Sequence, residues 1–267
     1  VLEDFHYLKS EVQKDFAIEL KAFHESSELC FIIVGVWLDE NKLVIYNGDL
    51  TGRIVPVNAD LWNEDELREV IQKGEDFLNI RFKESFTSEA IKASSGNVYI
   101  VQETCHRACN ESGIHKTVVG ERRLVGDGLN ARSLVAEIIQ EQSGRYNAFI
   151  TNYASGFQET ALAMHKWLLY PILTSSIEEL SKGLTYRSIR SKITSGHPQG
   201  KNLNPGNITQ ALKAVSSLQL SKSIQPIILD YDESNLTLHI VDKGFLIWLS
   251  MLDRNELLST VGLPEMT

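Results

Sequence analysis

The sequence predicts an α/β segment, then a helical region, then a smaller domain that combines helices with a β-hairpin. Three observations predict this order. An unbroken apolar run, LCFIIVGV at 29–36, has the length of a buried strand and follows a helix-like segment, DFAIELKAFHE. Residues 85–180 carry apolar residues at spacings of three and four, which indicates helices. After residue 181, two short helical segments precede two β-like runs joined by DESN.

The first element is the opening stretch VLEDFHYL, which has no initiating methionine and resembles a buried strand that ends in Glu3 and Asp4. Together with the following helix and the run at 29–36, it forms the strand–helix–strand order of a βαβ unit, whose strands run parallel. The continuous apolar character of 29–36 predicts a strand that is covered on both faces. We therefore expect a parallel sheet that lies between helices.

The middle of the chain is predicted to be helical. LWNEDELREVIQKGEDFL should form a helix that is capped by Asn63, with Glu66 three residues later completing the capping box. The stretch CHRAC places Cys105 and Cys109 on one face of a later helix. A zinc site needs about four ligands, and Cys30 lies in the predicted buried strand. Buried structural thiols are therefore the favoured interpretation, with a metal site as the alternative.

The last part of the chain is predicted to be a winged helix-turn-helix, because TYRSIRSKIT, NITQALKAVSSLQ and the hairpin IQPIILDY/LTLHIV occur in that order. Residues 180–229 contain seven lysines and arginines and no acidic residue. The side chains expected to contact DNA are Arg187, Arg190, Lys192, Lys201, Asn207, Gln210 and Lys213. The hairpin tip, DYDES, is acidic, and winged helices also bind proteins, so DNA and protein partners both stay open.

The overall composition is that of a globular protein, with 43% apolar and 23% charged residues in 267. The net charge of −9 argues against a protein that coats nucleic acid uniformly. Three cysteines do not form a disulfide framework, which favours a reducing, cytoplasmic location. No apolar run reaches the roughly 18 residues that a membrane-spanning helix needs.

Two carboxylates at the end of a strand are typical of the Walker B motif of nucleotide hydrolases. In that arrangement Glu3 holds Mg²⁺ on the nucleotide phosphates, and Asp4 orients or deprotonates the attacking water. The alternative is that both acids only stabilise the N-terminus of the following helix.

A family resemblance favours the first interpretation. VLEDFHYL, FIIVGVWLDENKL and NGDLTGRIVPVNADLWNEDELREVIQKGEDFLNIRF resemble, in this order, the second half of an AAA+ or STAND-type P-loop ATPase. The later helices and hairpin resemble the winged-helix domain of replication-initiator-type members. The resemblance implies an α/β core, a helical lid with linker helices and a winged helix at 1–82, 83–180 and 181–267.

The resemblance carries over unevenly to single residues. It implies that Glu3 and Asp4 bind Mg²⁺ and ATP, and that Arg53 reaches a neighbouring subunit's γ-phosphate; a surface ion pair is the alternative for Arg53. The sensor-1 place holds Val36 and Trp37, so Asn41 is the nearest amide that could reach a phosphate. The sensor-2 place after Gly96 lacks an arginine before Arg107, which fits a slow switch as well as a motor.

A phosphate-binding loop is not recognised within the sequence. GHPQGKN at 196–202 has three residues between its glycines where four are required, and Asn202 stands where Ser or Thr should contact Mg²⁺. It is therefore interpreted as a turn, and the loop is expected upstream.

The expected function is ATP binding and hydrolysis by a homo-oligomer that changes conformation or assembles on DNA, in replication, a mobile element or antiphage defence. Two alternatives stay open. One is a STAND-like signalling switch with a protein effector, in which the winged helix is a protein-docking joint. The other is a non-enzymatic transcription regulator whose ATPase region is degenerate.

Overall fold

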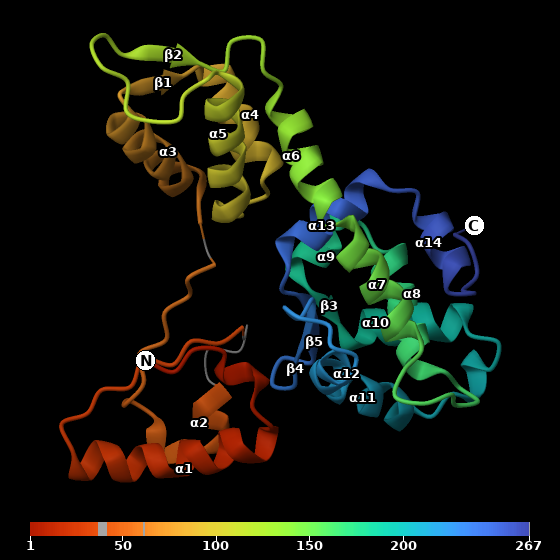
Figure 1. The fold of residues 1–267 in the computed structure, drawn as a ribbon. Coiled ribbons are helices and arrows are strands. Elements are labelled where there is room, and N and C mark those ends of the chain that lie inside the picture. Colours follow the sequence, from red (N-terminus) through yellow and green to blue (C-terminus); the bar gives the residue numbers. More distant parts are fainter. Residues whose placement is uncertain (37–41, 61, 267) are drawn as a thin grey trace. The chain divides into compact units, whose positions relative to one another are not determined.

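The computed structural model of the chain describes residues 1–36, 42–60 and 62–266 (Figure 1). It is mostly helical, with small sheets. Two compact units are present: Val1–Asn58, Thr151–Asp242 and Asn255–Thr267 form unit 1, and Ala59–Ile150 and Lys243–Arg254 form unit 2. These units divide the chain differently from the domains predicted at 1–82, 83–180 and 181–267. A boundary after Phe82 would separate its ring from that of Phe86, which stacks on it at 5.3 Å.

In the first 58 residues of unit 1, the described residues form no strand, so the predicted strand–helix–strand order is reduced to an isolated parallel bridge on either side of helix α1. Leu2 and Ile33 form a parallel bridge, in which the Leu2 N–H donates to Ile32 O and the Val34 N–H to Leu2 O, each at 2.8 Å. Helix α1 connects these two segments, and its apolar face packs on them around Ala17 and Leu20. The elements are η1 (Phe5–Tyr7), α1 (Ser10–Ser26), α2 (Lys42–Tyr46) and η2 (Gly48–Leu50).

The apolar run at 29–36 differs from its prediction. Phe31 and Ile33 pack against α1, but Leu29, Ile32 and Val34 are exposed at 63%, 58% and 49%. Cys30 is also exposed, so the prediction that it lies in a strand buried on both faces is wrong. The reason is that, among the described residues, one face of this run packs in the cluster of α1 and α2 while the other face stays exposed.

Unit 2 begins with the capped helix that the sequence predicts. Asn63 Oδ1 accepts the Glu66 N–H, and Glu66 Oε2 accepts the Asn63 N–H, each at 2.9 Å, which confirms the capping box. The elements that follow are α3 (Glu64–Leu78), β1 (Ile80–Phe82), α4 (Glu84–Ala93), α5 (Val98–Glu111), β2 (Arg123–Val125) and α6 (Ala131–Glu141).

A small parallel sheet corrects the prediction that this region is entirely helical. Strands β1 and β2 pair in parallel, with Ile80 opposite Arg123 and Phe82 opposite Val125. Ile80, Phe82 and Val125 are buried in one core with residues of α3, α4 and α5. Strands of three residues are too short to display a two-residue period, so the sequence pattern of the surrounding helices hides them.

Helix α13 (Lys243–Met251) returns to unit 2 from beyond the C-terminal hairpin. Its Phe245 and Trp248 rings lie 5.5 Å and 5.4 Å from the ring of Tyr146, and Phe149 meets Phe245 edge-on at 5.3 Å. Tyr146 and Phe149 belong to α7 (Ser143–Ala154). This aromatic cluster anchors α13 to unit 2, although α13 is far in sequence from the other helices of the unit.

The remainder of unit 1 contains the helices and hairpin predicted after residue 181. Its three-stranded antiparallel sheet has the order β3-β5-β4, with Leu184 opposite Leu238 and Tyr231 opposite Leu238. The elements are α8 (Met164–Thr174), α9 (Ile177–Lys182), β3 (Leu184–Thr185), α10 (Tyr186–Gly196), η3 (Gly200–Asn202), α11 (Pro205–Lys213), α12 (Val215–Ser221), β4 (Leu229–Asp232), β5 (Thr237–Ile240) and α14 (Arg254–Thr260). None of the described helices has the length and apolar character needed to cross a bilayer.

Candidate functional site

Glu3 and Asp4 directly follow the bridged residue Leu2, and both are exposed. Asp4 adopts the left-handed conformation, with φ 56° and ψ 25°, which aspartate tolerates better than most residues. The Phe5 N–H resumes pairing by donating to Val34 O at 3.1 Å, so Asp4 projects from the backbone between two points of contact. Both carboxylates therefore lie just beyond an isolated parallel bridge; in open α/β sheets, ligands bind at the corresponding carboxyl end of the strands.

The carboxylates of Glu3 and Asp4 are suited to a metal site that is completed by a nucleotide. The described residues contain no group of three His, Cys, Asp or Glu side chains arranged to hold a metal ion. Mg²⁺ in nucleotide enzymes is bound by one or two carboxylates, with substrate phosphates and waters as its other ligands. Glu3 and Asp4 could therefore hold a magnesium–nucleotide complex, whereas they could not form an all-protein metal cage.

The predicted sensor-1 residues fall mostly outside the described structure. Asn41 and Trp37 lie in the segment 37–41, which is not among the described residues. Val36 is half-buried, and its side chain has no group that could bind a phosphate.

Arg53 lies just after η2 and contacts α1. Its Nη1 atom lies 3.0 Å from Oε1 of Glu25, in the last turn of α1. A second ion pair, Lys21 Nζ to Asp49 Oδ2 at 2.7 Å, joins the same two elements. Arg53 is thus held in the surface ion pair that was the alternative to a role between subunits, and its side chain remains partly exposed, at 30%.

The resemblance places a sensor-2 arginine at the start of α5. In the structure, the distant residue Lys243 contacts the backbone just before this helix. Lys243 Nζ donates to Asp60 O at 2.7 Å and to Gly96 O at 3.1 Å, and burial lowers the pKa of this lysine. Sequence analysis missed Lys243 because 147 residues separate it from Gly96. Arg107 is not at this end of α5; it joins α5 to α6 through Glu141, at 3.0 Å and 2.7 Å.

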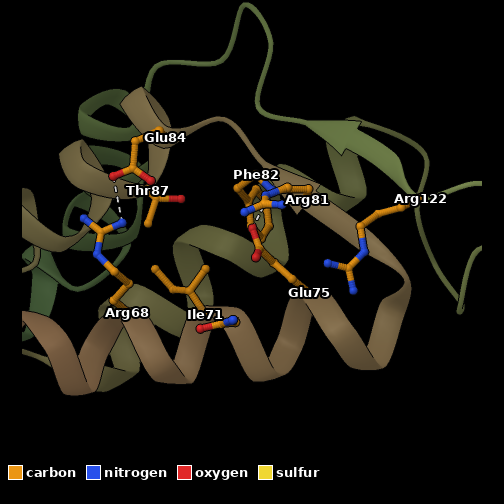
Figure 2. A pocket seen from close by; sticks show the side chains of 9 residues that line it. Arg68, Ile71, Glu75, Arg81, Phe82, Glu84, Thr87 and Arg122 are labelled. Carbon is orange, nitrogen blue, oxygen red and sulfur yellow. Dashed lines mark hydrogen bonds and ion pairs between the residues drawn. The ribbon is translucent and has the colours of Figure 1, made fainter.

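An open cavity of about 210 Å³ lies between α3, β1 and the start of α4 in unit 2 (Figure 2). Most of its charged groups are paired: Arg68 with Glu84 at 2.7 Å, and Glu75 Oε1 with the Phe82 N–H at 2.6 Å. Arg81 is a lining residue without an ion pair in the described structure. None of the predicted site residues lines the cavity, and its paired charges join α3 to β1 and α4.

The thiols of α5 agree with a structural role. Burial raises the pKa of Cys105 to about 12 and also raises that of Cys109. A thiol with a raised pKa is a poor nucleophile and a poor metal ligand at neutral pH.

The predicted DNA-contacting side chains occupy different environments in unit 1. Arg187 and Arg190 are exposed on α10, while Lys192 is half-buried and donates to Thr174 O at 3.2 Å. Lys213, at the end of α11, pairs with Glu233 at the hairpin tip.

Two further predicted contacts lie on α11, where Gln210 is exposed and Asn207 is half-buried, whereas the side chain of Lys201 is outside the described structure. The stretch 196–202 connects α10 to α11, which confirms that GHPQGKN is a turn between helices.

Comparison of the chain with models of protein families, with curated proteins and with solved structures finds no match.

Proposed function

We propose that this chain is the second part of an AAA+ or STAND-type P-loop ATPase that couples ATP binding and hydrolysis to conformational change or assembly on DNA. The observation that carries the proposal is the parallel Leu2–Ile33 bridge around α1, with Glu3 and Asp4 exposed at its carboxyl end. A Walker B motif requires the order strand, acidic pair, helix, parallel strand, and the parallel bridge on either side of α1 supports that order. In this proposal Glu3 binds Mg²⁺ and Asp4 orients the attacking water.

The uncovered face of the apolar run at 29–36 supports the proposal independently. Parallel sheets bury both faces beneath helices, yet Cys30, Ile32 and Val34, which alternate with the packed Phe31 and Ile33, are exposed on one face here. In residues 1–36 and 42–58, no further strand extends the Leu2–Ile33 bridge. In this proposal, further strands pair beside the Leu2–Ile33 bridge and further helices cover the exposed face. The Gly-rich loop that wraps the phosphates belongs to these additional elements.

The order of elements in the rest of unit 1 supports the DNA-linked part of the proposal. Helices α10 and α11, followed by the antiparallel pair β4–β5, follow the order of a winged helix-turn-helix. A cytoplasmic homo-oligomer remains part of this proposal.

The ion pair between Arg53 and Glu25 favours a second candidate, the nucleotide-locked signalling switch. An arginine that is already bound to a carboxylate in its own subunit must leave that partner before it reaches a neighbour's nucleotide. Such a competition suits a slow, assembly-controlled ATPase better than a rapid motor.

The test of the main proposal is Asp4→Asn in the complete protein that contains the phosphate-binding loop. Hydrolysis should fall about 100-fold, because a water-orienting carboxylate is lost. Binding of a fluorescent ATP analogue should change less than about threefold, since Asn also tolerates the left-handed conformation and preserves the local fold.

Asp15→Asn, a change of the same type at an exposed position of α1, is the matched control and should hydrolyse ATP normally. Wild-type hydrolysis by the Asp4 variant would contradict the proposal. A preceding sequence without a Gly-rich loop ending in Lys and Ser or Thr would contradict it as well.

Arg53→Ala and Glu25→Gln separate the two candidates for Arg53. If the guanidinium acts on a neighbour's phosphate, Arg53→Ala should slow hydrolysis at least about 1,000-fold while sparing ATP binding, because the charge that stabilises the transferring phosphate is lost. Glu25→Gln should retain or increase the rate, because it releases Arg53. Equal losses in both variants, measured by phosphate release, would show that only the ion pair matters.

A further inference from the structure

The basic side chains of residues 180–229 differ in whether a partner already neutralises them. Lys182 pairs with Glu178 at 2.6 Å, and Lys213 pairs with Glu233. Lys192 donates to Thr174 O, with Glu179 4.0 Å away. Arg187 and Arg190 are exposed and have no ion pair with any described residue. These two are also the only arginines in the stretch.

Helix α10 presents both guanidiniums on one face. Ile189 and Ile193 are fully buried, and the opposite face carries Arg187 and Arg190 with Ser191 and Thr194, all exposed. Residues at these spacings are neighbours on a helix surface, about 5–6 Å apart between Cβ atoms. This α10 face contains guanidiniums and hydroxyls, the groups that most often contact nucleic-acid phosphates, and no carboxylate.

The face of α11, which carries the predicted contacts Asn207, Gln210 and Lys213, has less free positive charge. Its Lys213 is bound to Glu233, and the neighbouring Asp232 is also at the hairpin tip. The carboxylate of Asp232 is occupied by its own turn, where it accepts the N–H groups of Ser234 and Asn235 at 2.8 Å and 2.9 Å. The hairpin tip thus retains negative charge beside α11, which an anionic backbone would avoid.

We infer that the α10 face binds the phosphate backbone of duplex DNA, and that Arg187 and Arg190 supply its main contacts. This inference rests on the DNA-linked part of the proposed function and changes which helix contacts the duplex. Guanidinium groups form paired hydrogen bonds with phosphate oxygens, which lysine cannot match. The hydroxyls of Ser191 and Thr194 can donate to the same backbone. Because contacts to backbone phosphates carry no sequence information, binding through this face is expected to be independent of sequence.

The test measures binding of the 267-residue chain to labelled duplexes of two unrelated sequences by fluorescence anisotropy, between 25 and 200 mM salt. Two lost phosphate contacts should lower the slope of log affinity against log salt by about 1.8 and weaken binding about tenfold or more at low salt. We expect this result for Arg187→Ala/Arg190→Ala with both duplexes. Arg187→Lys/Arg190→Lys should recover part of the affinity, because it restores the charge without the paired hydrogen bonds.

Lys182→Ala/Lys222→Ala removes the same charge from the same unit and should leave the salt slope unchanged. An equal loss of DNA affinity in this control would show that binding depends on net charge alone. Wild-type affinity and salt slope in Arg187→Ala/Arg190→Ala would overturn the inference. A larger loss in Gln210→Ala/Lys213→Ala would return the contact to α11. Displacement of DNA by polyglutamate at equal charge concentration would identify an acidic protein as the partner instead.

The absence of salt-dependent binding in the wild-type chain would overturn both the inference and the DNA-linked part of the proposed function. The ATPase part is tested separately by Asp4→Asn, so the two failures remain distinguishable.

Discussion

Gln219→Leu should lower the free energy of unfolding of the region containing β4 and β5 by about 3–5 kcal/mol. The Gln219 side chain is fully buried on α12. Its Oε1 accepts the N–H groups of Ile228 and Leu229 at 2.7 Å and 3.0 Å, and its Nε2 donates to Leu229 O at 2.8 Å. Leucine fills a similar volume but leaves three buried backbone groups without partners, each of which costs about 1–3 kcal/mol.

Hydrogen exchange of the Ile228 and Leu229 amides is the appropriate measurement for this variant, because a chain with two compact units need not unfold in one step. Gln210→Leu makes the same chemical change at an exposed position of α11 and should alter stability by less than about 0.5 kcal/mol. If the Ile228 and Leu229 amides exchange equally slowly in both variants, the buried glutamine does not hold β4 in place.

Gln219→Glu provides a second variant with a pH signature. The buried carboxylate cannot donate to Leu229 O, and burial should raise its pKa above that of an exposed glutamate. The protonated side chain regains a donor, so the variant should be most stable below the unfolded-state pKa and lose that stability as pH rises through the folded-state pKa. The difference in free energy of unfolding between Gln219→Glu and the wild type should therefore become smaller as the pH is lowered.

Trp248→Ala should destabilise unit 2 by about 3–5 kcal/mol, as is typical for truncating a buried tryptophan. Trp248 is 1% exposed, and its ring lies 5.4 Å from that of Tyr146 and 5.5 Å from that of Phe245. Removing the indole leaves a cavity in the cluster that anchors α13 to α7. Denaturation followed by circular dichroism, together with hydrogen exchange in α6 and α13, measures the loss.

Trp248→Phe is the matched control for this cluster, because it retains an aromatic ring and most of the buried area, so it should recover more than half of the lost stability. The amides of β4 and β5, which belong to unit 1, provide an internal reference and should keep their protection. Equal protection of α13 in Trp248→Ala and in wild type would contradict the anchoring role.

Features encoded within a few residues were accessible to sequence analysis. The box of Asn63 and Glu66 was predicted because both partners lie within one helical turn. The turn at 196–202 and the hairpin after it were predicted from local Gly, Pro and polar residues. The acidic pair at Glu3 and Asp4 follows a single bridged residue, Leu2, rather than the predicted buried strand.

Features that depend on distant partners required the tertiary structure. The apolar run containing Ile32 and Val34 predicts burial, but whether a second layer covers it is decided elsewhere in the fold. Lys213 adds to a basic stretch in sequence, yet its ion pair with Glu233 removes it from the free positive charge of unit 1. The parallel pairing of β1 with β2 likewise joins segments separated by a whole helical hairpin.

The sequence by itself determined most of the helices, the cap of α3 and the C-terminal hairpin, because spacing and composition act over one or two turns. The tertiary structure alone decided which charges are neutralised, which apolar face stays uncovered and where α13 and Lys243 attach. The physical reason is that ion pairs and buried contacts form between groups that the folded backbone brings together, and local patterns do not record those distances.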